Sequence, residues 1–379
     1  MAVGSGGKET WILAENRRHG FHNLSEMCRN GWMIRAPRML DLARSIDRRI
    51  SDLPSVRRLT GSPYFSGMAV VRGQELLFED YARDFGPDRR HSIQSITKTT
   101  VSLMIGWLVE EGRIDLSKTV AEYLPGIGSG YAGATVQDVL DMNVVNTFVE
   151  DYSDSYRKSG DPSAIQGYNR LEIAMGWRLP PEGEAPFGLR DFVSGITSDD
   201  VRNPGTETLY KSSNTEVLAW IAEAVTGESL YPLLVGIVEA AGIEGALYMS
   251  TDINGAPVVS GGGALTARDL ARYGLLFARG GVGVSGSKVG SRTFIDAARS
   301  GQGTDCSAPI DWLRYSNQLF TNGEWIGHLG FCGQLLMVHP ESETAIVYFS
   351  VLEEMNGDDD GWFEDVVRMA ETVLAHVTG

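Results

Sequence analysis

Apolar residues recur with the spacing of an amphipathic helix in several parts of the chain. Residues 36–53 show this pattern near the N-terminus. Behind Ser95 the apolar positions again follow the helical period, and Gly112 is placed to end that helix. Three more helices are expected over residues 214–227, 266–281 and 361–377. The second of these opens with a capping pattern, Thr266-x-x-Asp269.

Two other stretches have the pattern of β-hairpins. Residues 66–82 predict two strands around a turn at Gly73, and residues 333–352 predict two strands around a Pro-Glu-Ser turn. Helices and hairpins therefore occupy both ends of the chain, while the middle is helical and irregular.

This arrangement predicts a fold of the α/β plus all-α class. Residues 1–90 and 265–379 are expected to form one α/β domain built from both termini. Residues 91–264 are expected to form a mainly helical domain inserted into it.

Composition and charge narrow the range of partners. The 379 residues are 42% hydrophobic and 22% charged, as is usual for a globular protein. The formal net charge of −16 argues against nucleic acid and anionic membrane surfaces, since both attract basic patches. No stretch approaches the roughly 18 apolar residues of a membrane-spanning helix. The N-terminus also lacks the pattern of a secretory signal, so a cytoplasmic location is expected.

Cysteine and histidine spacing predicts no metal or cofactor. The cysteines are Cys28, Cys306 and Cys332, an odd number without the spacing of metal ligands. They therefore predict neither a disulfide framework nor a zinc site. The six histidines show no ligand pairing either.

Candidate chemistry begins with the Ser-x-x-Lys spacing from Ser95 to Lys98. Four of the six lysines have a serine three residues before them, so the spacing alone selects nothing. Only Ser95 opens a strongly apolar helix, where a lysine three residues on can reach the serine hydroxyl. The positive helix N-terminus and an apolar pocket favour a serine nucleophile with a neutral lysine base. The alternative is that Ser95 or Ser92 caps the helix and Lys98 is solvated.

A second stretch places Tyr210 before Ser212 and Asn214 at the start of a predicted helix. A tyrosine near a lysine can share its proton and act as a general acid or base. Asn214 is suited either to capping the helix or to holding a substrate carbonyl. A tyrosine in the core is the alternative for Tyr210.

A third stretch surrounds Gly330 and Gly333, which allow the backbone to approach a ligand closely. The N–H of Phe331, paired with that of Ser95, would form an oxyanion hole. A glycine-rich entrance to a strand is the alternative.

The order of these three stretches resembles the serine β-lactamase, or penicillin-recognising, family. The matching motifs are Ser95-Ile-Thr-Lys98, Tyr210-Lys-Ser212 and His328-Leu-Gly330. Segments such as SSNTEVLAWIAEAVTG and GGGALTARDLARYGLL are further similar to the nylon-oligomer (6-aminohexanoate-dimer) hydrolases and class C-like esterases. The resemblance covers nearly the whole chain and implies a β-lactamase-like fold, with an antiparallel sheet flanked by N- and C-terminal helices.

The resemblance implies catalysis through an acyl-enzyme. Ser95 would attack a carbonyl carbon, Lys98 and Tyr210 would relay protons, and the N–H groups of Ser95 and Phe331 would hold the oxyanion. Water would then release the acid.

The resemblance also implies a set of substrate contacts. Tyr152 matches a tyrosine that faces the substrate amide, and Glu172 lies near the place of an acidic residue for the substrate ammonium group. Ser212, His328 and Gly330 complete the expected substrate-binding residues.

Two departures bear on the substrate. His328 and Leu329 replace the lysine and threonine of the β-lactamase motif, which weakens recognition of a β-lactam carboxylate. Cys332 also departs from the residue expected in the nylon-oligomer enzymes.

The expected function is that of a serine hydrolase that cleaves an amide or ester of a small or oligomeric substrate. An acyltransferase acting through the same site and a non-catalytic penicillin-binding-like sensor are the alternatives. The expected partner is this small molecule, with no nucleic acid and no membrane; a homodimer is left open.

Overall fold

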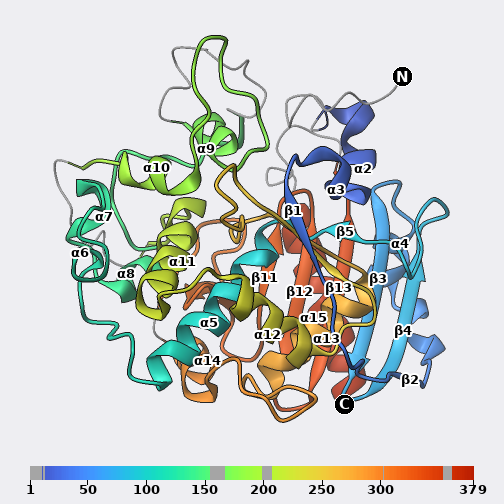
Figure 1. Cartoon of the computed structure of the whole chain (residues 1–379). Coiled ribbons are helices and arrows are strands. Elements are labelled where there is room, and N and C mark those ends of the chain that lie inside the picture. Colours follow the sequence, from blue (N-terminus) through green and yellow to red (C-terminus); the bar gives the residue numbers. More distant parts are fainter. Residues whose placement is uncertain (1–10, 12, 154–166, 199–206, 302, 353–360) are drawn as a thin grey trace.

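The computed structural model describes residues 11–379 except residues 12, 154–166, 199–206, 302 and 353–360. Its largest element is a nine-stranded sheet with the order β2-β4-β3-β13-β12-β11-β10-β9-β8 (Figure 1). The strands are β2 (Ala43–Arg44), β3 (Phe65–Arg72), β4 (Glu75–Tyr81), β8 (Thr304–Asp305), β9 (Arg314–Ser316), β10 (Leu319–Thr321), β11 (Ile326–Gly330), β12 (Gln334–His339) and β13 (Thr344–Ser350).

Both predicted hairpins are present, as β3–β4 and β12–β13. The first turn contains Gly73 with φ of +59°, a backbone conformation that glycine adopts without steric cost. Strand β3 also pairs antiparallel with β13, so that Val70 lies opposite Ile346. The two ends of the chain therefore build one sheet, and this part of the prediction is confirmed.

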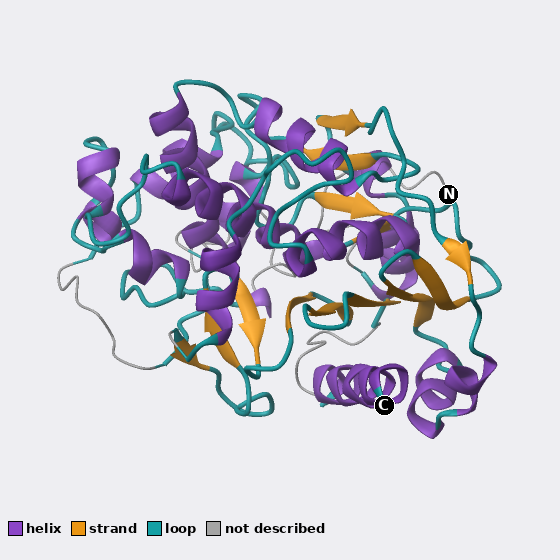
Figure 2. Ribbon diagram, turned by 90° about the horizontal axis from the view of Figure 1, so that it is seen from below, coloured by secondary structure: helices purple, strands orange, loops and turns teal. Residues whose placement is uncertain are grey.

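Helices cover both faces of this sheet. Along β13, Val347 enters one apolar core and Tyr348 enters another, because successive side chains of a strand point to opposite faces. Helix α13 (Ala267–Ala278) packs on the first face and helix α15 (Trp362–Thr378) on the second. Figure 2 shows α15 on one side of the sheet and the larger group of helices on the other.

The middle of the chain is mainly helical, with a second, small sheet of order β1-β6-β7-β5. Residues 91–264 contribute two whole strands and most of a third, which ends at Leu265, and the domain boundaries stay a prediction. The small-sheet strands are β1 (Gly31–Ile34), β5 (His91–Ser92), β6 (Leu247–Ser250) and β7 (Gly263–Leu265). The remaining elements are α2 (Ala14–His22), α3 (Leu24–Met27), η1 (Arg48–Asp52), α4 (Pro54–Thr60), η2 (Gln94–Lys98), α5 (Thr99–Glu110), α6 (Val120–Tyr123), α7 (Ser129–Ala132), α8 (Val136–Leu140), α9 (Tyr168–Ala174), α10 (Leu189–Ser194), α11 (Ser212–Thr226), α12 (Tyr231–Ala241) and α14 (Arg292–Arg299).

The long helix predicted over residues 36–53 is wrong. This segment instead runs along the edge of the large sheet as strand β2 followed by the short helix η1. The N–H groups of Ser45 and Asp47 donate to the carbonyls of Leu76 and Leu77 in β4. Pairing with a sheet edge satisfies backbone groups that a helix would have paired internally, and the apolar spacing alone does not distinguish the two.

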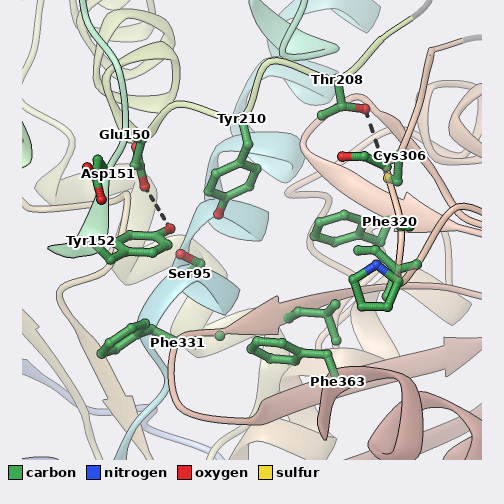
Figure 3. Close-up of a pocket in the computed structure, with 16 residues that line it drawn as sticks. Ser95, Glu150, Asp151, Tyr152, Thr208, Tyr210, Cys306, Phe320, Phe331 and Phe363 are labelled. Atoms are coloured by element: carbon green, nitrogen blue, oxygen red, sulfur yellow. Dashed lines mark hydrogen bonds between the residues drawn. The ribbon is translucent and has the colours of Figure 1, made fainter. Parts of the chain in front are cut away.

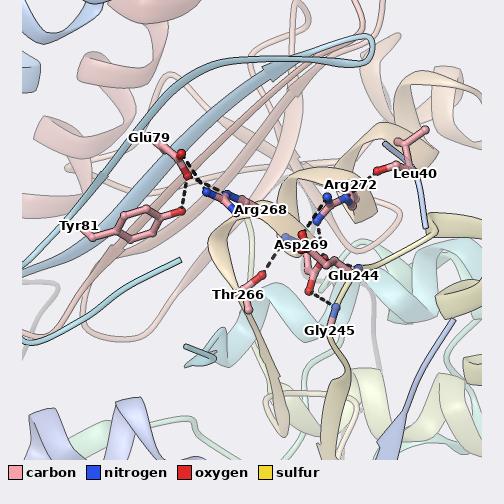
Figure 4. Close-up of polar contacts among 9 residues, drawn as sticks. All are labelled: Leu40, Glu79, Tyr81, Glu244, Gly245, Thr266, Arg268, Asp269 and Arg272. Atoms are coloured by element: carbon pink, nitrogen blue, oxygen red, sulfur yellow. Dashed lines mark hydrogen bonds and ion pairs between the residues drawn. The ribbon is translucent and has the colours of Figure 1, made fainter. Parts of the chain in front are cut away.

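Buried polar contacts fix the start of α13 (Figure 4). The predicted cap is present, since the Thr266 hydroxyl accepts a hydrogen bond from the Asp269 N–H. The Asp269 carboxylate accepts from the N–H groups of Glu244 and Gly245, at 2.7 and 3.0 Å, and pairs with Arg272 at 2.8 Å. Asp269 thus ties α13 to the loop that follows α12.

Removal of this carboxylate should destabilise the fold. We expect Asp269→Ala to lower the free energy of unfolding by about 3 kcal/mol, because it leaves a buried guanidinium without its closest partner. Asp296 is exposed on α14, and Asp296→Ala should change the same quantity by less than about 0.5 kcal/mol. Urea titrations of the two variants would test this, and equal effects would contradict the role of Asp269.

Candidate active site

A tight turn presents Ser95 at the start of an apolar helix. Ser95 lies in the short helix η2, which leads into α5. Gln94, the residue before it, has φ of +47°, a strained conformation for a residue with a side chain. Its amide donates to the Ser92 hydroxyl at 2.6 Å, and its carbonyl accepts from the Thr97 hydroxyl at 2.6 Å. These contacts hold the turn.

The structure contradicts the alternative in which a serine caps this helix. Ile93 is the N-cap residue of η2 and Lys98 that of α5, and neither makes a side-chain capping bond. Lys98 is also fully buried rather than solvated. The Ser95–Lys98 pair is therefore internal to the fold.

Three oxygen atoms surround the Lys98 amine. Lys98 Nζ lies 2.9 Å from Ser95 Oγ, 3.0 Å from Ser212 Oγ and 2.7 Å from the Ser260 carbonyl oxygen. Burial lowers the pKa of Lys98 to about 8, against the opposing effects of Glu150 and Glu216. The neutral amine that a general base requires is therefore the minor form near physiological pH, but far more accessible than for an exposed lysine.

The hydrogen bonds also decide where the lone pair of a neutral Lys98 points. The Ser260 carbonyl can only accept, so it takes one N–H of the amine. The Ser212 hydroxyl donates its one proton to Glu150 Oε1 at 2.8 Å, so it must accept the second N–H. The lone pair is left facing Ser95 Oγ, in position to remove its proton.

Glu150 anchors this arrangement from the loop before α9. Its carboxylate accepts from the backbone N–H and hydroxyl of Ser212 and from the Tyr152 hydroxyl, the last at 2.9 Å. Ser212 opens α11, so the contact also places the carboxylate at a helix N-terminus, where negative charge is favoured. The sequence signalled Glu150 only through its place two residues before Tyr152.

Tyr210 lies beside the same amine, immediately before α11. Lys98 Nζ is 4.9 Å from the centroid of the Tyr210 ring. Figure 3 shows the Tyr210 hydroxyl pointing toward Ser95. The three predicted reacting side chains, Ser95, Lys98 and Tyr210, are therefore brought together.

His328 lies behind Tyr210, where it has no part in lining the cavity. Its Nδ1 is 2.6 Å from the Leu329 carbonyl oxygen and its Nε2 is 3.1 Å from the Tyr315 hydroxyl. Because a carbonyl only accepts, Nδ1 carries the proton and the Tyr315 hydroxyl donates to Nε2. Burial lowers the pKa of His328 to about 3, so the ring is neutral. The expected contact of His328 with substrate is corrected to a supporting position under Tyr210.

Gly330 and Phe331 line the cavity at the end of β11. A Cβ atom on Gly330 would lie 2.6 Å from the Ile93 carbonyl oxygen, so only glycine lets the strand approach the turn before Ser95. The next residue, Phe331, is thereby placed beside Ser95 (Figure 3). The expected role of Gly330 as a substrate contact is supplemented by this structural one.

The reacting groups open into a cavity of about 500 Å³. Tyr152, Glu150 and Asp151 lie on one side of Ser95, and an apolar wall that includes Phe320 lies on the other (Figure 3). The lining residues are Ser95, Glu150, Asp151, Tyr152, Thr208, Tyr210, Cys306, Ser307, Ala308, Pro309, Ile310, Phe320, Leu329, Gly330, Phe331 and Phe363.

Glu172 is not among the residues that line this cavity. Its side chain is fully buried and pairs with the equally buried Arg178 at 2.9 Å. The expectation that Glu172 meets a substrate ammonium group is therefore corrected, because a buried carboxylate with an internal partner is closed to ligand. Glu150 and Asp151 provide the acidic side of the cavity instead.

Metal sites, membrane spans and the remaining Ser-x-x-Lys pairs can be assessed among the described residues. No group of three or more histidine, cysteine or acidic side chains among them could hold a metal ion. Within the same part of the chain, no single helix has the length and apolar character to cross a membrane, although the bent pair α11 and α12 passes that test jointly. Of the other Ser-x-x-Lys pairs, the exposed Lys288 bonds to Glu110, and the pairs at Lys8 and Lys158 lie outside the described residues.

Comparison with known proteins shows which family the chain belongs to. The Beta-lactamase family profile matches residues 56–235. The chain is 31% identical to the 6-aminohexanoate-dimer hydrolase of Paenarthrobacter ureafaciens over 395 residues, covering 98% of this chain and 96% of that protein.

Solved structures agree on the fold. A 6-aminohexanoate-dimer hydrolase homologue from Bacillus anthracis superposes with a TM-score of 0.83 at 22% identity, covering 100% of this chain and 98% of that one. A D-stereospecific amidohydrolase from Streptomyces sp. gives a TM-score of 0.56 at 19% identity, covering 85% and 98%. The expected fold class is thereby confirmed.

The buried amine predicts how the reactivity of Ser95 depends on pH. Lys98 must be neutral to accept the Ser95 proton, so the rate of labelling by a fluorophosphonate should rise with pH and reach half of its plateau at about pH 8. Stopped-time intact-mass measurements would give this rate, with Ser95→Ala as the unlabelled control. A rate independent of pH between about pH 6 and pH 10 would rule out Lys98 as the base.

Proposed function

The chain belongs to the β-lactamase family of hydrolases, and from this premise we propose that it cleaves an amide or ester bond through an acyl-enzyme on Ser95. The observation that carries the proposal is the buried Lys98 amine, held 2.9 Å from Ser95 Oγ. A serine becomes a nucleophile when a positioned base takes its proton, and this geometry provides the base.

The positions of the groups support the following proposed reaction. Ser95 Oγ attacks the carbonyl carbon while its proton passes to Lys98 Nζ. The N–H groups of Ser95 and Phe331 stabilise the negative charge on the carbonyl oxygen. The bond to the leaving nitrogen or oxygen then breaks as Tyr210 and Lys98 return a proton to it. Water attacks the Ser95 ester by the reverse sequence and releases the acid.

The lining of the cavity favours a substrate with two unlike ends. Glu150 and Asp151 form an acidic side, suited to a cationic group, whereas Ile310, Phe320 and Phe363 form an apolar side. An ω-aminoacyl amide or ester, with its ammonium group toward the acidic side, fits this division. The similarity to a 6-aminohexanoate-dimer hydrolase supports the same substrate class.

A β-lactam is a poorer fit. None of the described residues that line the cavity is lysine, arginine or histidine, so a β-lactam carboxylate would have no cationic partner among them. We therefore place amide or ester hydrolysis ahead of β-lactam hydrolysis.

Removing the nucleophile or the base should abolish or slow acylation. With a p-nitrophenyl ester, intact-mass analysis should find one acyl group on Ser95 in the unaltered protein and none in Ser95→Ala. Lys98→Ala should slow acylation by about 10²–10⁴-fold, since a positioned base contributes that much. Full activity of Ser95→Ala would refute the acyl-enzyme.

The fate of the acyl group separates hydrolysis from the alternatives. Steady release of the free acid supports a hydrolase. Acyl transfer to an added amine in preference to water would identify an acyltransferase, and a burst without turnover would identify a sensor.

The acidic side should contribute to substrate preference. We expect the unaltered protein to favour a 6-aminohexanoyl ester over the uncharged hexanoyl ester of the same alcohol. Asp151→Asn should reduce this preference about two- to fivefold, the size of an exposed ion pair, and the reduction should shrink at high salt. Asp296→Asn, an exposed change on α14, is the matched control. Equal kcat/KM ratios for all three proteins would contradict the assignment.

A further inference from the structure

Glu216 is a buried carboxylate near the reacting groups that does not line the active-site cavity. It lies on α11, four residues after Ser212, and residues four apart share one face of a helix. Ser212, which contacts Lys98, and Glu216 therefore lie on the same face of α11 and point toward the same part of the core.

A backbone segment joins Glu216 to Lys98. Glu216 Oε1 accepts a hydrogen bond from the Ser260 N–H at 2.9 Å, and the Ser260 carbonyl accepts one from Lys98 Nζ at 2.7 Å. The Ser260 N–H is thus bound by the Glu216 side chain, while the Ser260 carbonyl binds the Lys98 amine. Its carbonyl is one of the two fixed acceptors that leave the lone pair of Lys98 facing Ser95.

The surrounding close packing limits where this segment can lie. A Cβ atom on Gly262 would meet Ser250 Oγ at 2.3 Å and the Val258 carbonyl oxygen at 2.8 Å. The chain therefore passes through a narrow gap two residues after Ser260, and Glu216 binds the Ser260 peptide N–H just before that gap.

The charges around the two groups give Glu216 an electrostatic role as well. Lys98 faces the carboxyl groups of Glu150 and Glu216, the Tyr210 ring, and His328, whose low pKa keeps it neutral. Burial is the largest effect on the pKa of Glu216 and, with the nearby Asp252, raises it, whereas the bonds to Ser260 and the charge on Lys98 lower it. The balance of these effects puts the pKa at about 7. Glu216 in its charged form balances the positive charge of Lys98.

We propose that Glu216 is a positioning residue, which acts through the Ser260 peptide to aim Lys98 at Ser95 and which balances the charge that Lys98 gains on taking the Ser95 proton. This inference rests on the proposed function. It assigns to a residue outside the cavity a part in activating the nucleophile.

Two substitutions separate the positional effect from the electrostatic one. Glu216→Gln keeps an oxygen for the Ser260 N–H but removes the charge. Because the anion favours protonated Lys98, its loss should move the midpoint of the pH dependence of Ser95 labelling to lower pH. Glu216→Ala removes the oxygen as well, and we expect its plateau rate to fall by about 10²-fold, the cost of misplacing a reacting group by about 1 Å.

The experiment measures the rate of Ser95 labelling by a fluorophosphonate as a function of pH in the full chain. Glu223→Gln is the matched control, since Glu223 lies farther along α11 and pairs with Arg190. Its midpoint and plateau should equal those of the unaltered protein. Thermal melts of every variant test for loss of folding, and if Glu216→Ala is unfolded, the midpoint of Glu216→Gln decides.

The outcomes distinguish this inference from the function on which it rests. A lower midpoint in Glu216→Gln, with the control unchanged, supports it, because a merely structural role would not move the midpoint. A midpoint equal to that of Glu223→Gln overturns it while leaving Ser95 as the nucleophile. Absence of labelling in the unaltered protein overturns both.

Discussion

The active site depends on the burial of one amine among three oxygen atoms. Burial makes Lys98 easier to deprotonate, and the oxygens decide the direction in which the neutral amine presents its lone pair. Burial and orientation are both needed for a lysine base. An exposed lysine stays protonated, and the lone pair of a freely rotating amine does not stay directed at the serine hydroxyl. The strained turn at Gln94, the start of α11 and the segment at Ser260 each position one of these oxygens.

The large sheet completes the site from the other side. Strand β11 ends at Gly330, which comes close enough to the Ile93 carbonyl that no larger residue fits. This approach brings the backbone of Phe331 toward Ser95. The site therefore lies between the end of β11 and the turn before α5.

Opposing electrostatic effects set the working state of Lys98. Burial favours the neutral amine, whereas Glu150 and Glu216 favour the charged one. They approach it through different intermediaries, Glu150 through the Ser212 hydroxyl and Glu216 through the Ser260 peptide. In the proposed reaction these carboxylates would stabilise the cation that Lys98 becomes, while His328 behind Tyr210 stays neutral and adds no repulsion.

The sequence by itself determined the elements that depend on local chemistry: the two hairpins, the apolar helix behind Ser95 and the order of the reacting residues. Periodicity misled over residues 36–53, which have helical spacing but bond to a sheet edge. The resemblance misled at Glu172, which has the charge for a ligand but is buried with Arg178. Only the tertiary structure decided which side chains meet. The Ser260 carbonyl carries no sequence signal because every residue has one, and the part of Glu216 depends on a contact 44 positions away along the chain. Such long-range contacts are fixed by packing of the whole fold, which local patterns do not encode.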